Sequence, residues 1–506
     1  MLATFLPLFV GWPRRTLVRR VLFGLLLACF AALCWFAVAA ASTTTTAFDR
    51  LEGRPELLAG AAAAALVFMA ALTWLAYRYP TVTLIAVLAL LPLRLPLPLG
   101  DGNSNLLVPL YLLTLAMALA EIVCRDRLAL SPGFRRDPTR IALACMIAIL
   151  GVSSLWVGVA YAPRIKAFSL SLVKLFAFVV PFATLYYLVE GYLTSRLRLR
   201  RLIWAILASG VVLALIGIVQ APTRWVIVNR AGVLDNELMQ HTFRANSLFW
   251  DPNMFGRFCA LIVLLGVAMF LAVLAAIALG LTYSRSGLLS VLAGLIVVEL
   301  AWLGWKKGLI AVFATLLVLA GGLAGITAAR DTRDLGKKIE TTMGLNKLTG
   351  GRVYLVKAGW RMYKRHPVRG VGLAGFPQAF PSYRTSHAAK LTLKESHTTP
   401  VTIAAEQGTL GLVAFGGLLV TFFATTLRKR RYGASRDLYL MQAGIVGGVV
   451  ALCVSSLSYN AFFEDPYVWV FLAMGSAVAT RLVAPAQAER EGESSGPGMS
   501  DEPATD

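Results

Sequence analysis

The sequence predicts an all-α polytopic membrane protein, because long apolar segments recur along most of its 506 residues. Hydrophobic residues make up 58% of the chain, charged residues only 15%, and the mean hydropathy is +0.70. Each segment comes near the roughly 20 residues that a helix needs to cross a bilayer. A membrane β-barrel would show short segments of alternating polarity instead. We expect about 12–14 transmembrane helices.

The net charge of +22 comes largely from Lys and Arg clusters between apolar segments. Such clusters anchor cytoplasmic loops, which argues against nucleic-acid binding and for a cytoplasmic N-terminus. The clusters lie at 14–20, 125–140, 196–201, 306–307 and 428–431.

The apolar segments define an ordered set of candidate spans. They are 21–41, 57–77, 81–97, 105–124, 141–160, 167–190, 202–220, 286–304, 308–328, 400–426, 437–459 and 466–483. The run 255–283 must cross the membrane an even number of times to keep every basic cluster inside, so it predicts a short helical hairpin or a re-entrant pair. The first segment resembles a signal peptide but is long, which favours an uncleaved span and leaves cleavage open.

The spans and polar stretches divide the chain into five regions. These are N-terminal transmembrane helices (1–220), an outer loop with central helices (221–328), a large extracytoplasmic loop (329–399), C-terminal transmembrane helices (400–483) and a disordered cytoplasmic tail (484–506). The polar composition of the tail cannot form a core.

Within the large loop, residues 352–365 predict a basic amphipathic helix that lies in the lipid headgroup layer. One face carries Val353, Val356 and Trp360, and another carries Lys357, Arg361 and Lys364. His366 and Pro367 end the helix. The glycines at 370, 372 and 375 predict a flexible turn.

The six cysteines predict neither disulfides nor a metal site, and no cofactor is expected. They lie in or beside apolar segments without metal-ligand spacing, as buried small hydrophobes do.

The histidines and several arginines indicate an anionic substrate at the outer face. All four histidines, His241, His366, His387 and His397, fall in the polar stretches 221–253 and 329–399. Arg244, Arg285 and Arg352 lie at outer membrane boundaries in separate parts of the chain. A diphosphate needs several charged donors, and the planar guanidinium supplies them in pairs. Arg285 lies between apolar stretches, where an ionised side chain is costly and therefore suggests function.

Other polar residues each have two interpretations. Lys174, inside the span 167–190, either contacts substrate or pairs with a buried carboxylate. Arg257 either joins the phosphate site or pairs with Asp251, which is itself expected to cap a helix.

His397 can accept a proton from a hydroxyl, because the pKa of an unperturbed histidine is near 6.5. Glu406 either orients His397 or packs alone between helices. His366 is expected at a helix end, and His241 and His387 in solvent.

Four motifs, in order across about 240–415, resemble the O-antigen ligase and O-antigen polymerase superfamily. The first runs from Arg244 through Asp251-Pro-Asn253 to Gly256, and the second is Ser284-Arg285-Ser-Gly287. The third begins at Gly351-Arg352 and extends to Gly372. The fourth contains Ser396-His397, Glu406-Gln-Gly408 and Gly411.

The resemblance implies a GT-C-like, metal-independent and inverting glycosyltransferase in the bacterial cytoplasmic membrane, with its active site facing outward. Its partners would be an undecaprenyl-diphosphate-linked glycan donor, a glycan or glycolipid acceptor and membrane lipids. By the resemblance, Arg244, Arg285 and Arg352 would hold the diphosphate. The polar residues themselves add Arg257, Lys174 and Glu406 as further candidate substrate-binding residues. His397 would activate the acceptor hydroxyl.

Two other classes of function compete with a transferase. A transporter or flippase needs a site near the midplane, where only Lys174 is a candidate. A structural scaffold leaves the outer Arg and His residues without a role. The choice between ligase and polymerase, the sugars and the oligomeric state stay open.

Overall fold

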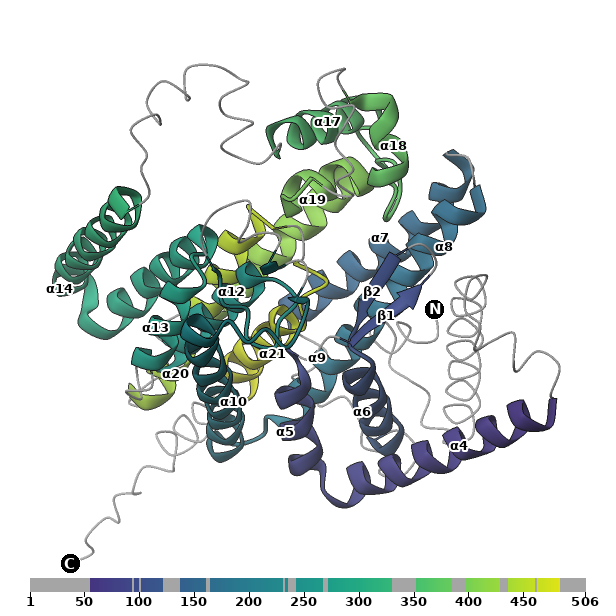
Figure 1. Ribbon diagram of the computed structural model, residues 1–506, viewed down its shortest axis with the longest axis horizontal. Coiled ribbons are helices and arrows are strands. Elements are labelled where there is room, and N and C mark those ends of the chain that lie inside the picture. Colours follow the sequence, from purple (N-terminus) through teal and green to yellow (C-terminus); the bar gives the residue numbers. More distant parts are fainter. Residues whose placement is uncertain are drawn as a thin grey trace, which may run out of the picture.

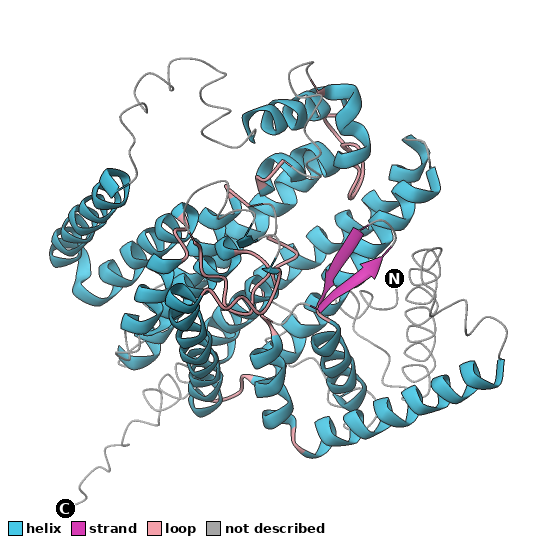
Figure 2. Cartoon of the chain, in the orientation of Figure 1, coloured by secondary structure: helices cyan, strands magenta, loops and turns pink. Residues whose placement is uncertain are grey.

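The computed structural model describes residues 55–92, 95–99, 102–121, 137–160, 164–230, 233–234, 243–266, 272–329, 352–384, 396–427, 436–459 and 462–482. These residues form a helical bundle with one small β-hairpin (Figures 1 and 2). The expected first span 21–41, the tail 484–506 and two histidines, His241 and His387, lie outside them.

The N-terminal half contributes nine labelled elements up to Thr223. They are α4 (Pro55–Arg78), α5 (Pro80–Leu90), β1 (Leu95–Leu99), β2 (Gly102–Leu106), α6 (Val108–Leu119), α7 (Pro138–Ala160), α8 (Arg164–Lys174), α9 (Val180–Tyr192) and α10 (Arg196–Thr223). A π-helical turn, η3 (Leu175–Val179), joins α8 to α9.

The remaining elements carry the four motifs. They are α12 (Pro252–Gly266), α13 (Ala272–Leu281), α14 (Arg285–Ala329), α17 (Arg352–Arg365), α18 (Phe376–Tyr383), α19 (Thr399–Thr426), α20 (Arg436–Ser456), α21 (Pro466–Ala477) and the π-helical turn η6 (Val478–Leu482).

Membrane-spanning helices are confirmed. Five described helices are long and apolar enough to cross a bilayer: Pro138–Val157, Leu170–Tyr192, Arg196–Thr223, Thr399–Thr426 and Arg436–Ser456. A sixth results if the bent pair Leu66–Arg78 and Pro80–Leu90 forms one span. By this criterion the described residues do not reach the expected 12–14. Several of the expected spans are shorter helices, such as α6 and α12.

The expected span 81–97 was wrong in its second half. Helix α5 ends at Leu90, and β1 pairs antiparallel with β2 from Leu95 opposite Leu106 to Leu99 opposite Gly102. The sequence of β1, Leu-Pro-Leu-Pro-Leu, explains the change, because each proline removes a helical N–H donor. Proline is tolerated at the edge of a sheet, which a two-stranded hairpin provides.

The central apolar run forms two short helices, in agreement with the predicted hairpin. Helices α12 and α13 pack against each other and have 15 and 10 residues. Helix α14 then breaks at Gly304, whose φ of 73° separates the two expected spans 286–304 and 308–328.

Helix α17 has the predicted ends, but its packed face was not predicted. Leu355, Ala358, Gly359 and Met362 are buried against α18 and α19, whereas Trp360 is 48% exposed. Leu355, Ala358 and Met362, with Phe376, Phe380 and Ala405, belong to a small apolar cluster separate from the main core. Helices α17 and α18 lie at one edge of the molecule, beside α19 (Figure 1).

The described cysteines are unpaired. Cys259 is buried as expected, Cys453 is half-buried, and Cys145 is exposed on α7, contrary to expectation.

Candidate functional site

The first two motifs meet through the side chain of Arg244. Its Nε donates to the carbonyl of Thr282 (2.8 Å), and its terminal nitrogen donates to Oδ1 of Asn253 (2.7 Å). The hydroxyl of Ser284 donates to the same Asn253 oxygen (3.2 Å). One amide oxygen therefore holds the start of α12 and the start of α14 against Arg244.

The two helix starts are close because a glycine lies between them. A Cβ at Gly256 would lie 2.8 Å from Cβ of Ser284 and 2.8 Å from Oγ1 of Thr282. Asp251 accepts from the backbone N–H of Asn253 (2.6 Å), which confirms the predicted capping role. Ser284 accepts from the N–H of Gly287 (3.1 Å) and caps α14 in the same way.

A buried glutamine, which the sequence analysis missed, fixes the segment before α12. Oε1 of Gln220 accepts from the N–H groups of Asn246 (3.2 Å) and Ser247 (2.7 Å), and its Nε2 donates to the carbonyl of Ser247 (3.1 Å). Asn246 donates to the carbonyls of Val228 and Phe249. A polar residue at the end of an apolar span was the available signal, because a buried amide needs partners.

The third and fourth motifs join where α19 breaks. Gly408 has a φ of 67°, and the backbone hydrogen bonds that would continue the helix are replaced by bonds to the turn after α17. The carbonyls of Ala405 and Glu406 accept from Val371 and Gly372, each at 2.8 Å. The N–H groups of Thr409 and Leu410 donate to Pro367 (2.7 Å) and Val368 (3.4 Å). We call this set of four hydrogen bonds the clasp.

The clasp corrects the prediction of a flexible turn. Gly370 and Gly372 are buried, with φ of 65° and 94°. A Cβ at Gly370 would collide with the backbone of Glu406, and one at Gly408 with the carbonyl of Val368. These glycines permit close backbone approach in a packed turn and do not serve flexibility.

His397 is held in an unusual backbone conformation just before α19. Its φ is 56°, in the left-handed region that few non-glycine residues adopt. The hydroxyl of Ser396 stabilises the turn, accepting from the N–H of Thr398 (3.1 Å) and lying 2.7 Å from Oγ1 of Thr402. Such conformations persist where the surroundings fix them and concentrate at functional sites.

His397 lies within electrostatic reach of two other motifs. Its pKa is lowered first by burial and then by the charge of Arg352, while the carboxylate of Asp251 opposes the change. Charges from the first and third motifs therefore act on the imidazole of the fourth, and the lowered pKa favours its neutral form, which can accept a proton.

The three predicted diphosphate ligands differ in their present bonding. Arg244 is half-buried and hydrogen-bonded, as described above. Arg285 is the exposed first residue of α14 and follows Ser284, so it lies beside the Arg244–Asn253 contact. Arg352 is the half-buried first residue of α17. Arg285 and Arg352 make no hydrogen bond or ion pair with the described residues.

Lys174 and Glu406 belong to one ion-pair network, which adjoins the clasp because the carbonyl of Glu406 is one of the clasp's acceptors. Nζ of Lys174 lies 2.9 Å from Glu464 and 3.9 Å from Glu406. The other carboxylate oxygen of Glu406 accepts from the N–H of Phe376 (3.4 Å), at the start of α18. Of the interpretations left open, the structure supports a carboxylate partner for Lys174, and Glu406 contacts Lys174 and α18. Contact of either residue with substrate stays a prediction.

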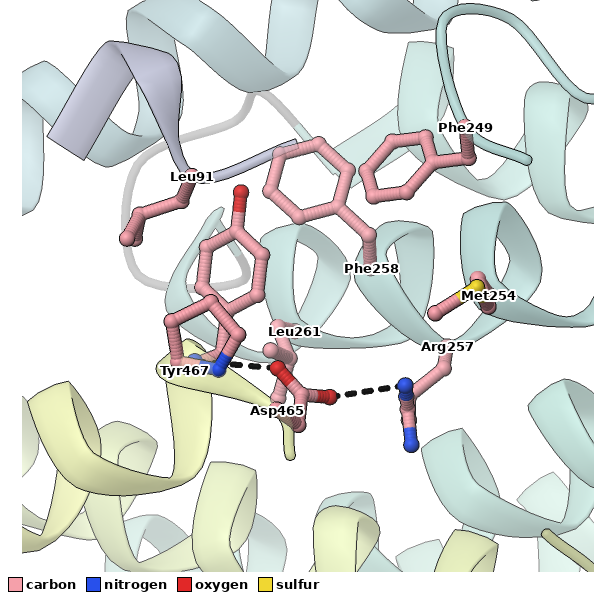
Figure 3. A pocket seen from close by; sticks show the side chains of 9 residues that line it. Leu91, Phe249, Met254, Arg257, Phe258, Leu261, Asp465 and Tyr467 are labelled. Carbon is pink, nitrogen blue, oxygen red and sulfur yellow. Dashed lines mark hydrogen bonds and ion pairs between the residues drawn. The ribbon is translucent and has the colours of Figure 1, made fainter. Parts of the chain in front are cut away.

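Arg257 pairs with Asp465 and not with Asp251, the carboxylate that one of its two interpretations named, and its contact with substrate stays a prediction. The two side chains are 6% and 4% exposed and 2.8 Å apart, and Asp465 also accepts from the N–H of Tyr467 (2.9 Å). The pair lies beside a small aromatic-lined pocket that includes Phe249, Met254 and Phe258 (Figure 3). Glu464 and Asp465 are adjacent acidic residues between two apolar spans, a signal that the sequence analysis did not use.

His366 ends α17 as predicted. Its Nε2 lies 3.2 Å from the hydroxyl of Tyr383, and its pKa is lowered by burial and by Arg369 and Arg365. No described contact links it to His397.

Comparison with known proteins agrees with the motifs. Residues 270–416 match a protein-family model described as O-Antigen ligase, which supports assignment to the O-antigen ligase and polymerase superfamily. The matched region contains Arg285, Arg352, His397 and the clasp, and it excludes Arg244 and Asp251. No curated protein matches the chain.

Proposed function

We propose that this chain, whose residues 270–416 match the O-antigen ligase family model, transfers a glycan from undecaprenyl diphosphate to a sugar hydroxyl at the outer face of the cytoplasmic membrane. The observation that carries the proposal is the convergence of Asp251, Arg352 and His397 from three separate motifs. A neutral base near Arg352, which makes no ion pair with the described residues, suits a reaction in which a hydroxyl loses a proton and a diphosphate leaves.

His397 accepts the proton of the acceptor hydroxyl. The hydroxyl oxygen forms a bond to the anomeric carbon as the bond from that carbon to the diphosphate oxygen breaks, so configuration inverts in one displacement. The lowered pKa keeps the imidazole unprotonated and available at neutral pH.

Arg244, Arg285 and Arg352 receive the charge that develops on the diphosphate. Guanidinium groups bind phosphate oxygens through paired charge-assisted hydrogen bonds, so we propose that these arginines stabilise the leaving group without a metal ion. Arg244 also positions Asn253 and Ser284, and so contributes to the architecture of the site.

The proposed transporter alternative gains no support from the residue on which it rested. Lys174, its midplane candidate, has Glu464 and Glu406 as ion-pair partners.

The test is product analysis by mass spectrometry. The purified, lipid-reconstituted protein is incubated with an undecaprenyl-diphosphate oligosaccharide and a chelator, first alone and then with candidate glycolipid acceptors. Longer lipid-linked chains with free undecaprenyl diphosphate identify a polymerase, and transfer only after acceptor addition identifies a ligase. An unchanged donor under every condition, or activity that the chelator removes, would contradict the proposal.

A further inference from the structure

Helix α17 carries a second apolar stripe besides the face that packs on α19. Val353, Val356, Trp360 and Tyr363 recur at helical spacing and are half-buried or exposed. The rings of Trp360 and Tyr363 are in contact, with centroids 5.1 Å apart. The described residues therefore pack against one apolar face of α17, and they leave the second stripe partly exposed.

The stripe continues the exposed apolar surface of a membrane-spanning helix. The hydroxyl of Tyr363 lies 3.0 Å from Oγ1 of Thr409 on α19, and the carbonyl of Val368 accepts from Leu410. Val368, Leu410 and Val413 are 61%, 49% and 68% exposed. Exposed aliphatic side chains on a spanning helix face lipid, so the adjoining stripe on α17 begins where lipid is already present.

The charge beside the stripe is entirely positive. Lys357, Arg361 and Lys364 are exposed along its edge, and residues 352–384 contain seven Lys and Arg residues with no Asp or Glu. Arg361 donates to the carbonyl of Tyr383 (2.9 Å) and keeps its charge. A surface with an aromatic centre and a basic margin complements anionic lipid headgroups.

We propose that the Val353–Val356–Trp360–Tyr363 stripe docks α17 on the outer face of the membrane that the protein spans. Trp360 lies at the boundary between lipid and water, and the basic edge contacts anionic phospholipid headgroups. Indole and phenol rings favour this layer because one part of the ring is apolar and another is polar. The docking does not depend on the transferase activity. It would also hold Arg352, the first residue of α17, at headgroup depth.

Photocrosslinking of the full-length protein tests the proposal. The photoreactive residue p-benzoylphenylalanine replaces Trp360 in nanodiscs of mixed phosphatidylcholine and phosphatidylglycerol, and adducts are identified by mass spectrometry. We expect phospholipid adducts in which phosphatidylglycerol exceeds its share of the bilayer by about twofold or more. In a Lys357→Gln, Arg361→Gln, Lys364→Gln background that share should return to the bilayer composition.

The matched control places the same photoreactive residue at Val413, which should give lipid adducts without headgroup preference. Adducts at position 360 to peptides from 330–351 or 385–395, or to a second copy of the chain, would overturn the proposal. So would the absence of lipid adducts at 360 while position 413 gives them.

Discussion

Two groups of buried or half-buried charges in this protein differ in how completely the chain neutralises them. In the first, Arg140 pairs with Glu190, and Arg481 lies 3.6 Å from the same carboxylate. Arg481 also donates to the backbone carbonyl of Glu190 (2.9 Å). The group joins the ends of α7, α9 and η6, where the sequence predicts the cytoplasmic side.

The second group, around His397, has an excess of positive charge. The charges of Arg352 and Asp251 act on the imidazole, and Arg244 and Arg285 lie in the first two motifs, whose helix starts are in contact. Arginines that have a carboxylate partner within the protein tend to fix structure, whereas Arg285 and Arg352, which make no ion pair with the described residues, suit an anionic ligand. We therefore expect the Arg140 group to contribute stability, and we propose that the His397 group carries the chemistry.

Of the changes considered, replacing the proposed base, His397, should lower the activity most. We expect His397→Ala to lower the transfer rate by about 10²–10⁴-fold, as removal of a general base does, with donor binding retained. Rates are measured with the purified variant and a fixed donor concentration. His366→Ala is the matched control and should retain turnover, and unchanged turnover in His397→Ala would remove the assignment.

The Arg140 group should respond through stability and not through chemistry. Arg140→Ala leaves the buried Glu190 short of a partner and should cost about 3–5 kcal/mol in the free energy of unfolding. The control is Arg200→Ala, whose pair with Asp437 is exposed and should contribute less than about 1 kcal/mol. Denaturant unfolding in detergent measures both. If Arg140→Ala keeps its stability but loses turnover, the Arg140 group serves the reaction and the expected stabilising role is wrong.

The clasp connects stability to the site, because it positions α17 relative to α19. Gly408→Ala places a side chain at a φ of 67° and against the carbonyl of Val368. The strain and the collision together should destabilise the clasp by about 2–4 kcal/mol and reduce transfer. Gly417→Ala in the same helix, with open space around it, should leave thermal stability and transfer unchanged. Equal behaviour of the two variants would show that the clasp is dispensable.

The sequence predicted features that depend on local pattern. Helix α17 begins and ends where its apolar period and His366-Pro367 place it. The run 255–283 contains two short helices, as the positions of the flanking basic clusters predict. Features that depend on partners far away in the sequence were not predicted. Gly408 lies inside an apolar run that reads as continuous helix, and only the turn at 367–372 explains its break. The pairing of Arg257 with Asp465 joins residues that are far apart in sequence.

Removing one proposed diphosphate ligand should have a smaller effect than removing the base. Arg352→Ala should weaken donor binding by about 10- to 100-fold, equivalent to loss of charge-assisted hydrogen bonds. Binding of a labelled lipid diphosphate to reconstituted protein measures it. Arg230→Ala, an exposed outer-loop arginine outside the motifs, is the control. Equal affinity of wild type and Arg352→Ala would exclude this arginine from the diphosphate site.

The smallest expected effect is a shift in the pH profile, and it tests the convergence of the motifs directly. His397 must be neutral to accept a proton, so kcat/KM rises as the pH increases through its pKa, which lies below the usual value. Arg352 lowers that pKa by its charge, so Arg352→Gln should move the acidic limb to higher pH. Asp251 acts in the opposite direction, so Asp251→Asn should move the limb to lower pH. Shifts of opposite sign would establish that both charges act on one imidazole, whereas identical profiles would separate His397 from the other two motifs.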